Sequence, residues 1–248
     1  MKAFASDFDG TLYFYQETDR MKAGDIAAIR RFQANGNAFG VCTGRSLKGI
    51  TMALPEPPGF DFYILASGAL IVDRDYRTIH THCISRDLTA EINARYEKQA
   101  RIVIQANDTV YTLTGKYHPM QTKIDTLTDI PGDAIYGFSF GFESAERAME
   151  IAGELNARYA GQIAAFQNVT NVDIVASGCS KGSGVRFVKE YFGAVEISGI
   201  GDSYNDIPML TAADVAFTFP FAPEEAKRQA RHIVSSVGEA LEIMEKDE

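Results

Sequence analysis

The chain contains no tryptophan and only three cysteines, and it has neither a run of lysine or arginine nor a long apolar stretch. Cys42, Cys83 and Cys179 are odd in number and widely spaced, and they form no CxxC pair, so we expect reduced thiols rather than a disulfide framework. No apolar run approaches the ~18 residues that a membrane-spanning helix needs. The apolar segment between Met1 and Asp7 is too short for a signal peptide. These absences predict a cytoplasmic protein with no membrane partner.

Positive charge is also scarce. The 24 Lys and Arg residues stand against 33 Asp and Glu residues, which gives a net charge of −9. This balance argues against a nucleic-acid partner, because nucleic-acid binding depends on contacts between basic residues and phosphates. A small phosphorylated ligand remains compatible with it, since a metal ion and two or three cationic side chains can make a locally positive pocket. Nothing in the composition implies a protein partner.

Short apolar segments that end on polar residues are the most regular feature present. They comprise residues 2–7, 38–42, 61–66, 195–201 and 214–219. Their apolar residues are consecutive rather than alternate, as in parallel strands buried on both faces. Helical patterns between and after them cover residues 22–34, 182–192, 205–211, 223–231 and 236–245. Strands that alternate with helices predict an α/β fold with a doubly wound, Rossmann-like parallel sheet.

The middle of the chain has a different pattern. It comprises helix 86–98, strands 101–105, 109–113 and 135–142, helix 144–159, and strands 162–167 and 171–176. Small and aromatic residues alternate through 137–142, as in an antiparallel sheet with one covered face. Hairpin turns are expected at Asn107-Asp108 and from Asn168 to Asn171. We therefore predict an α+β domain at residues 85–177, inserted into a core formed by residues 1–84 and 178–248.

Acidic residues follow two of the predicted strands. Asp7 and Asp9 lie where the first strand gives way to the turn Gly10-Thr11, and Asp202 and Asp206 follow a later strand. In doubly wound sheets, reactive groups collect at the carboxyl ends of the strands. Carboxylates this close ionise together only beside a cation, and Mg²⁺ prefers such oxygen ligands. A lone Asp-x-Asp is better interpreted as a capped turn, but the second acidic pair favours a metal site.

Two of these acids, and three further residues, suit phosphoryl transfer. A carboxylate can attack phosphorus to form an aspartyl-phosphate that water hydrolyses, and Asp7 suits that role because it lies on the strand itself. Asp9, in the turn, suits a general acid and base. Thr43 offers a hydroxyl, and Gly44 exposes a backbone N–H with no side chain in the way. Lys181 opens a helix, where a bound anion would offset the unfavourable helix dipole.

Asn205 carries an amide that could donate to a phosphate oxygen or orient Asp206. Plainer interpretations exist for each segment: Thr43-Gly44 as a polar turn, Lys181 as a solvated lysine, and Asn205 as part of a helix cap. Their joint occurrence favours phosphoryl transfer over these readings. The histidines add no metal site, because His80 and His82 lack cysteine or acidic partners at the spacing of a zinc site, and we expect both on the surface.

Four motifs resemble those of the haloacid dehalogenase (HAD) superfamily: DFDGTL at 7–12, TGR at 43–45, SKG at 180–182 and GDSYNDIPML at 201–210. The whole chain, including the place and size of the insertion, is similar to Cof-type sugar-phosphate phosphatases with a class IIB cap. This resemblance implies a nucleophile at Asp7 and an acid/base at Asp9. It implies Mg²⁺ held by Asp7, the Asp9 backbone carbonyl and Asp202, with Asp206 in support. It also implies that the phosphoryl group is bound by Thr43, Gly44, Lys181 and Asn205.

Two segments depart from the pattern of the family. Ser67-Gly68 replaces the usual Asn-Gly, and Phe219-Pro220-Phe221-Ala222 replaces Met-Gly-Asn-Ala. Neither includes the acidic residues, so both bear on the substrate rather than on the chemistry. The sequence thus predicts a Mg²⁺-dependent phosphatase of small phosphorylated metabolites, with sugar phosphates as the expected class. A phosphomutase or phosphotransferase acting on hexose phosphates is the alternative, and a phospho-ligand sensor without turnover is a third hypothesis.

Overall fold

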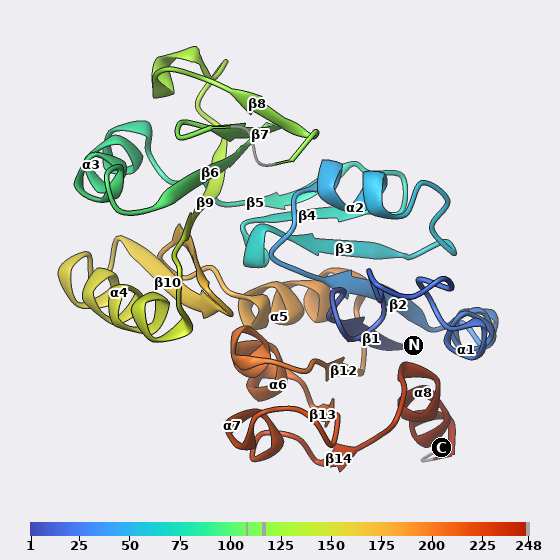
Figure 1. Cartoon of the computed structure of the whole chain (residues 1–248). Helices are drawn as coiled ribbons and strands as arrows, with labels where there is room; N and C mark the ends of the chain where they lie inside the picture. Colours follow the sequence, from blue (N-terminus) through green and yellow to red (C-terminus); the bar gives the residue numbers. More distant parts are fainter. Residues whose placement is uncertain (108, 116–117, 247–248) are drawn as a thin grey trace.

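The computed structural model describes residues 1–107, 109–115 and 118–246 (Figure 1). Its strands form two sheets. The larger has the order β14-β13-β12-β1-β2-β3-β4-β5, and the smaller has the order β10-β11-β9-β6-β7-β8. Of the turn predicted at Asn107-Asp108, the second residue lies outside the described residues. None of the described helices has the length and apolar character needed to span a membrane.

The larger sheet is parallel except at one edge. β1 (Lys2–Ser6) lies between β2 (Ala38–Cys42) and β12 (Glu196–Ile200), and pairs in parallel with both. The parallel arrangement continues through β3 (Phe62–Leu65), β13 (Val215–Thr218) and β14 (His232–Ile233). Two further strands, β4 (Leu70–Asp73) and β5 (Thr78–Thr81), are antiparallel to their neighbours. The predicted doubly wound α/β fold is confirmed, and its strand order reverses direction at β1.

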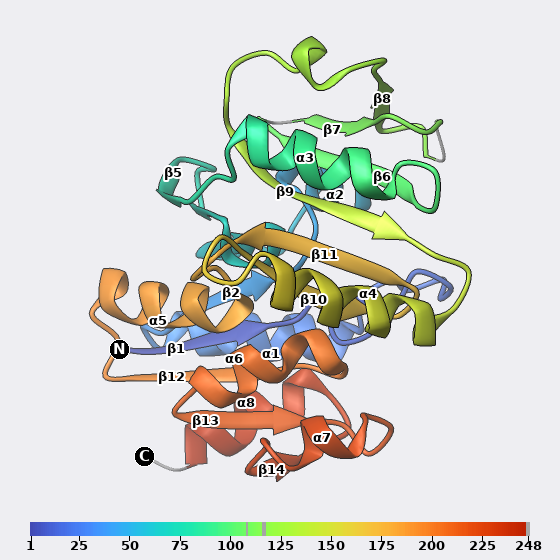
Figure 2. The ribbon, with the colours of Figure 1, turned by 90° about the vertical axis from the view of Figure 1, so that its left-hand side faces the viewer.

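Helices cover both faces of the larger sheet. Figure 2 shows α5 (Lys181–Phe192) and α6 (Ile207–Ala212) in front of it, and α1 (Ala23–Ala34) and α8 (Val237–Lys246) behind it. Successive strand residues alternate between the two faces. In β1, Phe4 packs with Ile29 and Phe32 of α1, whereas Ala3 and Ala5 pack with Val185 of α5. A short helix, α2 (Leu47–Ala53), follows β2.

The helix predicted at residues 223–231 is the clearest error. The observed helix α7 covers only Glu224–Lys227. It ends early because the backbone N–H of Arg231 donates to the carbonyl of Ala216 at 2.8 Å, which draws the chain into β14 beside β13. The helix predicted at 205–211 is split instead, into the 3₁₀ turn η3 (Tyr204–Asp206) and α6.

The described helices of the insertion cover one face of the smaller sheet. Its strands are β6 (Arg101–Ala106), β7 (Thr109–Thr112), β8 (Gln121–Lys123), β9 (Ile135–Gly141), β10 (Ile163–Asn168) and β11 (Asn171–Ala176). The helices α3 (Arg86–Tyr96) and α4 (Ala145–Arg158) lie on the side away from the larger sheet (Figure 1). Ile102, Phe140 and Leu155 belong to the core between these helices and the sheet. Asn168 pairs with Asn171 across a tight turn, which confirms the second predicted hairpin.

The opposite face of the smaller sheet carries a row of three side chains. Strand register pairs Val103 of β6 with Ser139 of β9, and Ser139 with Asp173 of β11. Gln105 lies two residues after Val103 and therefore projects from the same face. Gln105 donates from Nε2 to the carbonyl of Gly44 at 2.8 Å, so this open face meets the loop that follows β2. The predicted domain boundaries at 84/85 and 177/178 stay a prediction.

Candidate active site

Asp7 is the first residue after β1, at the point where the strand order of the larger sheet reverses. Its backbone N–H donates to the carbonyl of Ile200 at 2.9 Å, and its own carbonyl accepts from Ser6 Oγ at 2.7 Å. Only 5% of the residue is exposed. The backbone of Asp7 is therefore fixed by its neighbours, and its carboxylate is presented at the carboxyl edge of the sheet.

Lys181 lies between two of the predicted acids. Its Nζ is 2.6 Å from Asp7 Oδ1 and 2.5 Å from Asp206 Oδ1. Lys181 is 2% exposed and Asp206 is fully buried. Ser180 caps α5 by accepting from the backbone N–H of Ser183 through Oγ, which places Lys181 at the first helical position. Buried charges are tolerated only when they are paired, so these three groups depend on one another.

The charges of this trio follow from burial and proximity. Burial raises the pKa of the Asp7 carboxyl well above its usual value, and the nearby Asp206 raises it further, while Lys181 opposes the shift. For Lys181, burial lowers the pKa, but attraction to Asp206 and Asp7 outweighs burial and holds that pKa well above its ordinary value. Lys181 is therefore an ammonium at neutral pH.

Asp206 organises the loop that follows β12. Its Oδ2 accepts from the backbone N–H groups of Asp202 and Ser203, each at 3.0 Å, and lies 3.2 Å from Ser203 Oγ. Its Oδ1 accepts a hydrogen bond from Lys181 Nζ. Because both oxygens are engaged, Asp206 holds Asp202 and Lys181 in place rather than offering a free ligand atom.

Carboxylate oxygens of Asp7, Asp202 and Asp206 lie within 4.8 Å of one another. Asp202 Oδ1 accepts from Thr11 Oγ1 at 2.7 Å, and burial raises the pKa of the Asp202 carboxyl. Two ionised carboxylates are stable this close to each other only with a compensating cation, and Lys181 contacts Asp7 and Asp206 but not Asp202. The donor set of hard oxygens fits Mg²⁺, with Asp7 and Asp202 as the acids that have an oxygen to offer.

The side chain of Asp9 lies outside this cluster. Arg45 donates from Nε to Asp9 Oδ2 at 2.7 Å and from Nη2 to Asp9 Oδ1 at 2.6 Å. The guanidinium carbon of Arg45 lies 5.3 Å from the ring centre of Phe8 and 5.7 Å from that of Tyr13. The Asp9 side chain is 48% exposed. Its carboxylate is thus committed to Arg45, and a metal contact from this residue is left to its backbone.

The predicted phosphate-binding residues surround the same place. The Thr43 N–H donates to the Ile64 carbonyl at 2.8 Å, so this loop continues the edge of the sheet. A Cβ at Gly44 would lie 3.1 Å from Asp173 Oδ2 and 3.5 Å from Ser67 Oγ, which shows how closely the loop approaches the smaller sheet. Asn205 Oδ1 accepts from Ser203 Oγ at 2.6 Å. That bond leaves the Asn205 amide N–H groups to donate elsewhere.

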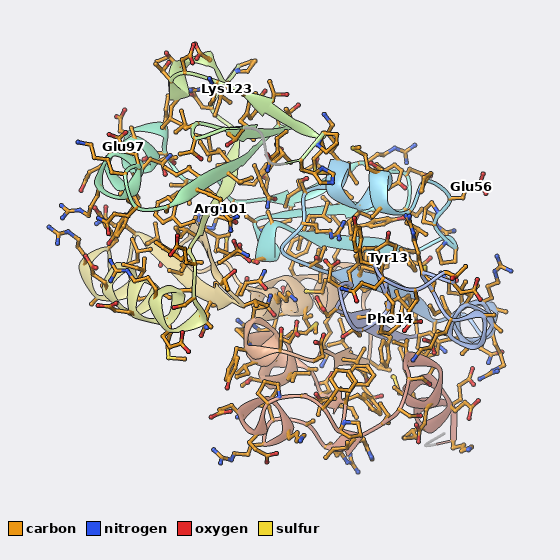
Figure 3. All side chains as sticks on the ribbon, viewed as in Figure 1. Tyr13, Phe14, Glu56, Glu97, Arg101 and Lys123 are labelled. Atoms are coloured by element: carbon orange, nitrogen blue, oxygen red, sulfur yellow. The ribbon has the colours of Figure 1, made fainter. Side chains whose placement is uncertain are left out.

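These residues line a cavity of about 680 Å³ that lies between the two sheets. Asp7, Asp9, Thr43, Gly44, Lys181, Asp202 and Asn205 line it, while Asp206 lies behind Lys181. The smaller sheet contributes Val103, Gln105, Val110, Asn168 and Asp173 to the lining. Tyr13, which also lines the cavity, is labelled in Figure 3 on the loop after β1. The structure therefore brings seven of the eight predicted site residues to a single cavity, and the eighth, Asp206, contacts one of them, Lys181.

The residues of this site that were given no role in the sequence analysis include Thr11, Arg45, Gln105 and Asp173. Thr11 and Arg45 stand inside the DFDGTL and TGR motifs, and so a signal for them was present. Gln105 and Asp173 alternate with the buried Ile104 and Ile174, and this period-two pattern marks an open sheet face. The pattern does not say what that face meets.

Comparison with known proteins agrees with the geometry. A profile of haloacid dehalogenase-like hydrolases matches residues 4–240. The chain is 26% identical over 248 residues to a Haemophilus influenzae protein with the provisional name of phosphatase, which covers 96% of this chain and 94% of that protein. It is 25% identical over 236 residues to the glucosyl-3-phosphoglycerate/mannosyl-3-phosphoglycerate phosphatase of Persephonella marina, covering 87% of this chain and 83% of the relative.

Solved structures share the fold. A haloacid dehalogenase-like hydrolase from B. subtilis superposes with a TM-score of 0.85 at 19% identity, covering 99% of both chains. A sugar phosphatase of HAD subclass IIB superposes with a TM-score of 0.81 at 19% identity, covering 100% of this chain and 99% of that one. At such identities the likeness shows the architecture alone.

Proposed function

Because the chain belongs to the haloacid dehalogenase-like hydrolase family and is a phosphatase of that family, we propose a specific chemistry for it. The chain hydrolyses small phosphorylated metabolites, sugar phosphates foremost, with Mg²⁺ and through an aspartyl-phosphate. The observation that carries this proposal is the buried Asp7–Lys181–Asp206 trio, which lies beside Asp202 and of which Asp7 and Lys181 line the cavity. Binding alone needs no carboxylate in that place, whereas covalent transfer does.

Asp7 is the proposed nucleophile. Lys181 holds Asp7 Oδ1 at 2.6 Å, so the orientation of the carboxylate is set before substrate binds. One oxygen of the Asp7 carboxylate would attack phosphorus, forming an O–P bond as the bond to the leaving oxygen breaks. The ammonium of Lys181 would oppose the negative charge that builds up on the phosphoryl oxygens. Thr43, Gly44 and Asn205 would donate hydrogen bonds to the same oxygens.

Asp9 is the proposed acid and base. It would give a proton to the leaving oxygen and later take one from the water that hydrolyses the aspartyl-phosphate. Its place at the cavity, two residues from Asp7, suits a group that acts on the far side of the phosphorus. Arg45 would orient the ionised form of Asp9, which accepts the proton from water, since it donates to both oxygens of the carboxylate.

Mg²⁺ would be held by Asp7 and Asp202, with the Asp9 backbone carbonyl as a further ligand and Asp206 in support. When bound, the ion would offset the negative charge shared by Asp7 and the phosphoryl group. Thr11 would fix the direction of Asp202 through its 2.7 Å hydrogen bond. The chain's own contribution is therefore a rigid set of oxygens that is poised to receive the cation.

The lining of the cavity favours hydrolysis over transfer between sugars. A mutase acting on hexose phosphates holds a second phosphate far from the nucleophile and needs cations there. Among the described lining residues from the smaller sheet and its loops, none is lysine or arginine. Transfer of phosphate from a sugar bisphosphate to a monophosphate, with little inorganic phosphate released, would favour the mutase instead.

Hydrolysis of p-nitrophenyl phosphate tests the chemistry directly. We expect turnover with Mg²⁺ and none after chelation, and we expect Asp7→Asn to lower kcat by at least about 10³-fold, or roughly 4 kcal/mol of barrier. Asp214→Asn, which changes an exposed acid paired with Lys189, is the matched control and is expected to keep wild-type activity. A folded Asp7→Asn protein that retained half of the wild-type rate would refute the nucleophile assignment.

A further inference from the structure

Asp173 lies on the open face of the smaller sheet. It lies on β11, and its register neighbour across β9 is Ser139. Asp173 lines the cavity together with Asn168, Gln105 and Val103, all from the same sheet. Of these four side chains, only that of Asp173 is acidic. Among the described residues of the smaller sheet that line the cavity, Asp173 is therefore the one that brings a carboxylate to it.

The carboxylate is held in a fixed direction. Ser139 Oγ donates to Asp173 Oδ1 at 2.6 Å, and Asn168 Nδ2 donates to Oδ2 at 3.0 Å. Each carboxylate oxygen can accept two hydrogen bonds, so one position on each oxygen stays open. Oδ2 lies 3.1 Å from where a Cβ on Gly44 would be. The unused acceptor positions of Asp173 therefore lie beside Gly44, one of the residues proposed to bind the phosphoryl group. The leaving group of a bound phosphate ester would be attached to that phosphoryl group.

The charge and surroundings of Asp173 favour a ligand that donates hydrogen bonds to its carboxylate from uncharged groups. Burial raises the pKa of its carboxyl, while hydrogen bonds from Ser139 and Asn168 and the charge of Lys181 oppose that shift. Within the described residues, Asp173 forms no ion pair. A partly buried carboxylate without a cation gains most from further hydrogen-bond donors, and hydroxyl groups supply them without adding charge.

Gln105 also favours a ligand that donates hydrogen bonds, because one of its acceptor atoms lacks a partner. Its Nε2 donates to the Gly44 carbonyl at 2.8 Å, and this bond fixes which end of the amide carries the oxygen. The oxygen, Oε1, is buried and has no hydrogen-bond partner among the described residues. Buried acceptors without partners are unusual in folded proteins. Two acceptors, one on β6 and one on β11, therefore lie on the cavity side of the smaller sheet and lack donors.

We propose that Asp173 is a specificity-determining residue whose carboxylate accepts hydrogen bonds from hydroxyl groups of the leaving group, close to the ester oxygen. It selects polyhydroxylated monophosphates, those of sugars and polyols, over esters that lack hydroxyls. It also disfavours leaving groups with a carboxylate near the ester, because like charges repel. Gln105 Oε1 provides a second acceptor for the same group. This inference rests on the phosphatase function proposed above and names the class of substrate that fits it.

A structural role for Asp173 is the competing explanation. Asn168 begins the turn between β10 and β11, so its bond to Asp173 also stabilises that hairpin. A purely structural residue would affect all substrates alike. Substitution of a residue that binds hydroxyl groups lowers kcat/KM only for the substrates that have hydroxyl groups. The two explanations are therefore separated by comparing substrates with the same phosphate and different leaving groups.

The test compares kcat/KM for p-nitrophenyl phosphate, which has no hydroxyl, with that for the primary phosphate esters of glycerol, ribose and glucose. All are assayed with Mg²⁺ in the wild type and in Asp173→Ala. We expect the wild type to prefer at least one hydroxylated ester. We expect Asp173→Ala to lower kcat/KM for that ester by about 10- to 100-fold, the effect of losing hydrogen bonds to a charged group. Turnover of p-nitrophenyl phosphate should stay within about twofold, which also shows that the variant is folded.

Two further variants sharpen the result. Asp173→Asn removes the charge and keeps an amide oxygen, so we expect a smaller loss on hydroxylated esters and a rise in kcat/KM for phosphoglycerate, whose carboxylate is no longer repelled. Asp125→Asn is the matched control, because Asp125 is exposed and does not line the cavity. It should leave all substrates unchanged.

Equal losses on p-nitrophenyl phosphate and on the hydroxylated esters would overturn the inference in favour of the structural role. A wild type that prefers no hydroxylated ester would also overturn it, while leaving the phosphatase function standing. A wild type that fails to hydrolyse even p-nitrophenyl phosphate with Mg²⁺ would instead contradict the proposed function itself.

Discussion

Arg45 holds both carboxylate oxygens of Asp9, at 2.7 and 2.6 Å, while its guanidinium lies over the rings of Phe8 and Tyr13. Those rings stack on each other, with centres 4.7 Å apart and 11° between their planes. Arginine can stack and donate as a fork at the same time, and lysine cannot. The direction of the proposed acid/base is therefore set by a side chain that is itself fixed by two buried aromatic rings.

Replacing Arg45 with lysine keeps the positive charge beside Asp9 and removes the two-bond contact that fixes the direction of the Asp9 carboxylate. We expect Arg45→Lys to lower kcat about tenfold or more, because a fork of two charge-assisted bonds becomes one mobile ammonium. KM should change little. Arg74→Lys is the control, since Arg74 pairs with Asp61 at 2.7 Å and does not line the cavity. Equal kcat values for the two variants would argue against the orienting role.

Removing the Lys181 ammonium should destabilise the fold as well as the site. Lys181→Met leaves Asp7 and Asp206 buried without their cation, and breaking a buried pair in this way costs about 3–5 kcal/mol. Urea unfolding measures that loss. Lys189→Met breaks the exposed pair with Asp214, worth at most about 1 kcal/mol. Adding Asp206→Asn to Lys181→Met should restore part of the stability, and no restoration would show that the loss arises elsewhere.

Gly68 limits how the start of α5 is placed. Its φ is +95°, and a Cβ there would overlap the carbonyl oxygen of Ser180, the residue that caps the helix carrying Lys181. We expect Gly68→Ala to destabilise the fold by on the order of 1–3 kcal/mol, from backbone strain and displacement of that helix. Gly153→Ala, on the exposed side of α4 with open space around it, should instead stabilise by about 0.5–1 kcal/mol. If both substitutions changed the unfolding free energy in the same direction relative to the wild type, this account would be contradicted.

His80 should make stability depend on pH. Its ring lies 4.6 Å from that of Phe187, and burial, together with the neighbouring His82, lowers the pKa of His80. The folded state therefore binds the proton less tightly than the unfolded state, so the stability conferred by the neutral ring is present above the unfolded pKa of about 6.5 and is lost as the pH falls below it. Between about pH 7.5 and about pH 5, the urea midpoint should fall further in the wild type than in His80→Gln. A fall of the same size in both proteins would exclude His80 as the cause.

The parts of the fold that were predictable from sequence are those with a local signal. Apolar runs ending at Asp7, Thr43 and Asp202 located the strand ends, and helical periodicity located α1 and α5. The reversal that makes β4 antiparallel had no such signal, although Leu70 to Val72 form an apolar run, because the reversal depends on Ala66 and Ser67 adopting positive φ values of 45° and 51°. Neither residue type marks a left-handed turn.

The functional site divides in the same way. Motif residues such as Lys181 were found because their types and spacing carry the chemistry. The neighbours that orient them were not, since the partner of Asp9 is 36 residues away and the partner of Gln105 is 61 residues away. The early end of α7 has the same origin, because a hydrogen bond from Arg231 to a strand outweighs local helical preference. Contacts between distant segments leave little trace in local periodicity.

The bond from Gln105 to the Gly44 carbonyl has a kinetic consequence. It ties the smaller sheet to the loop expected to surround the phosphate, so this tie must break for the two sheets to part. If departing products leave by that route, the frequency of parting limits how many molecules the enzyme can process each second, however fast the bonds to phosphorus are made and broken.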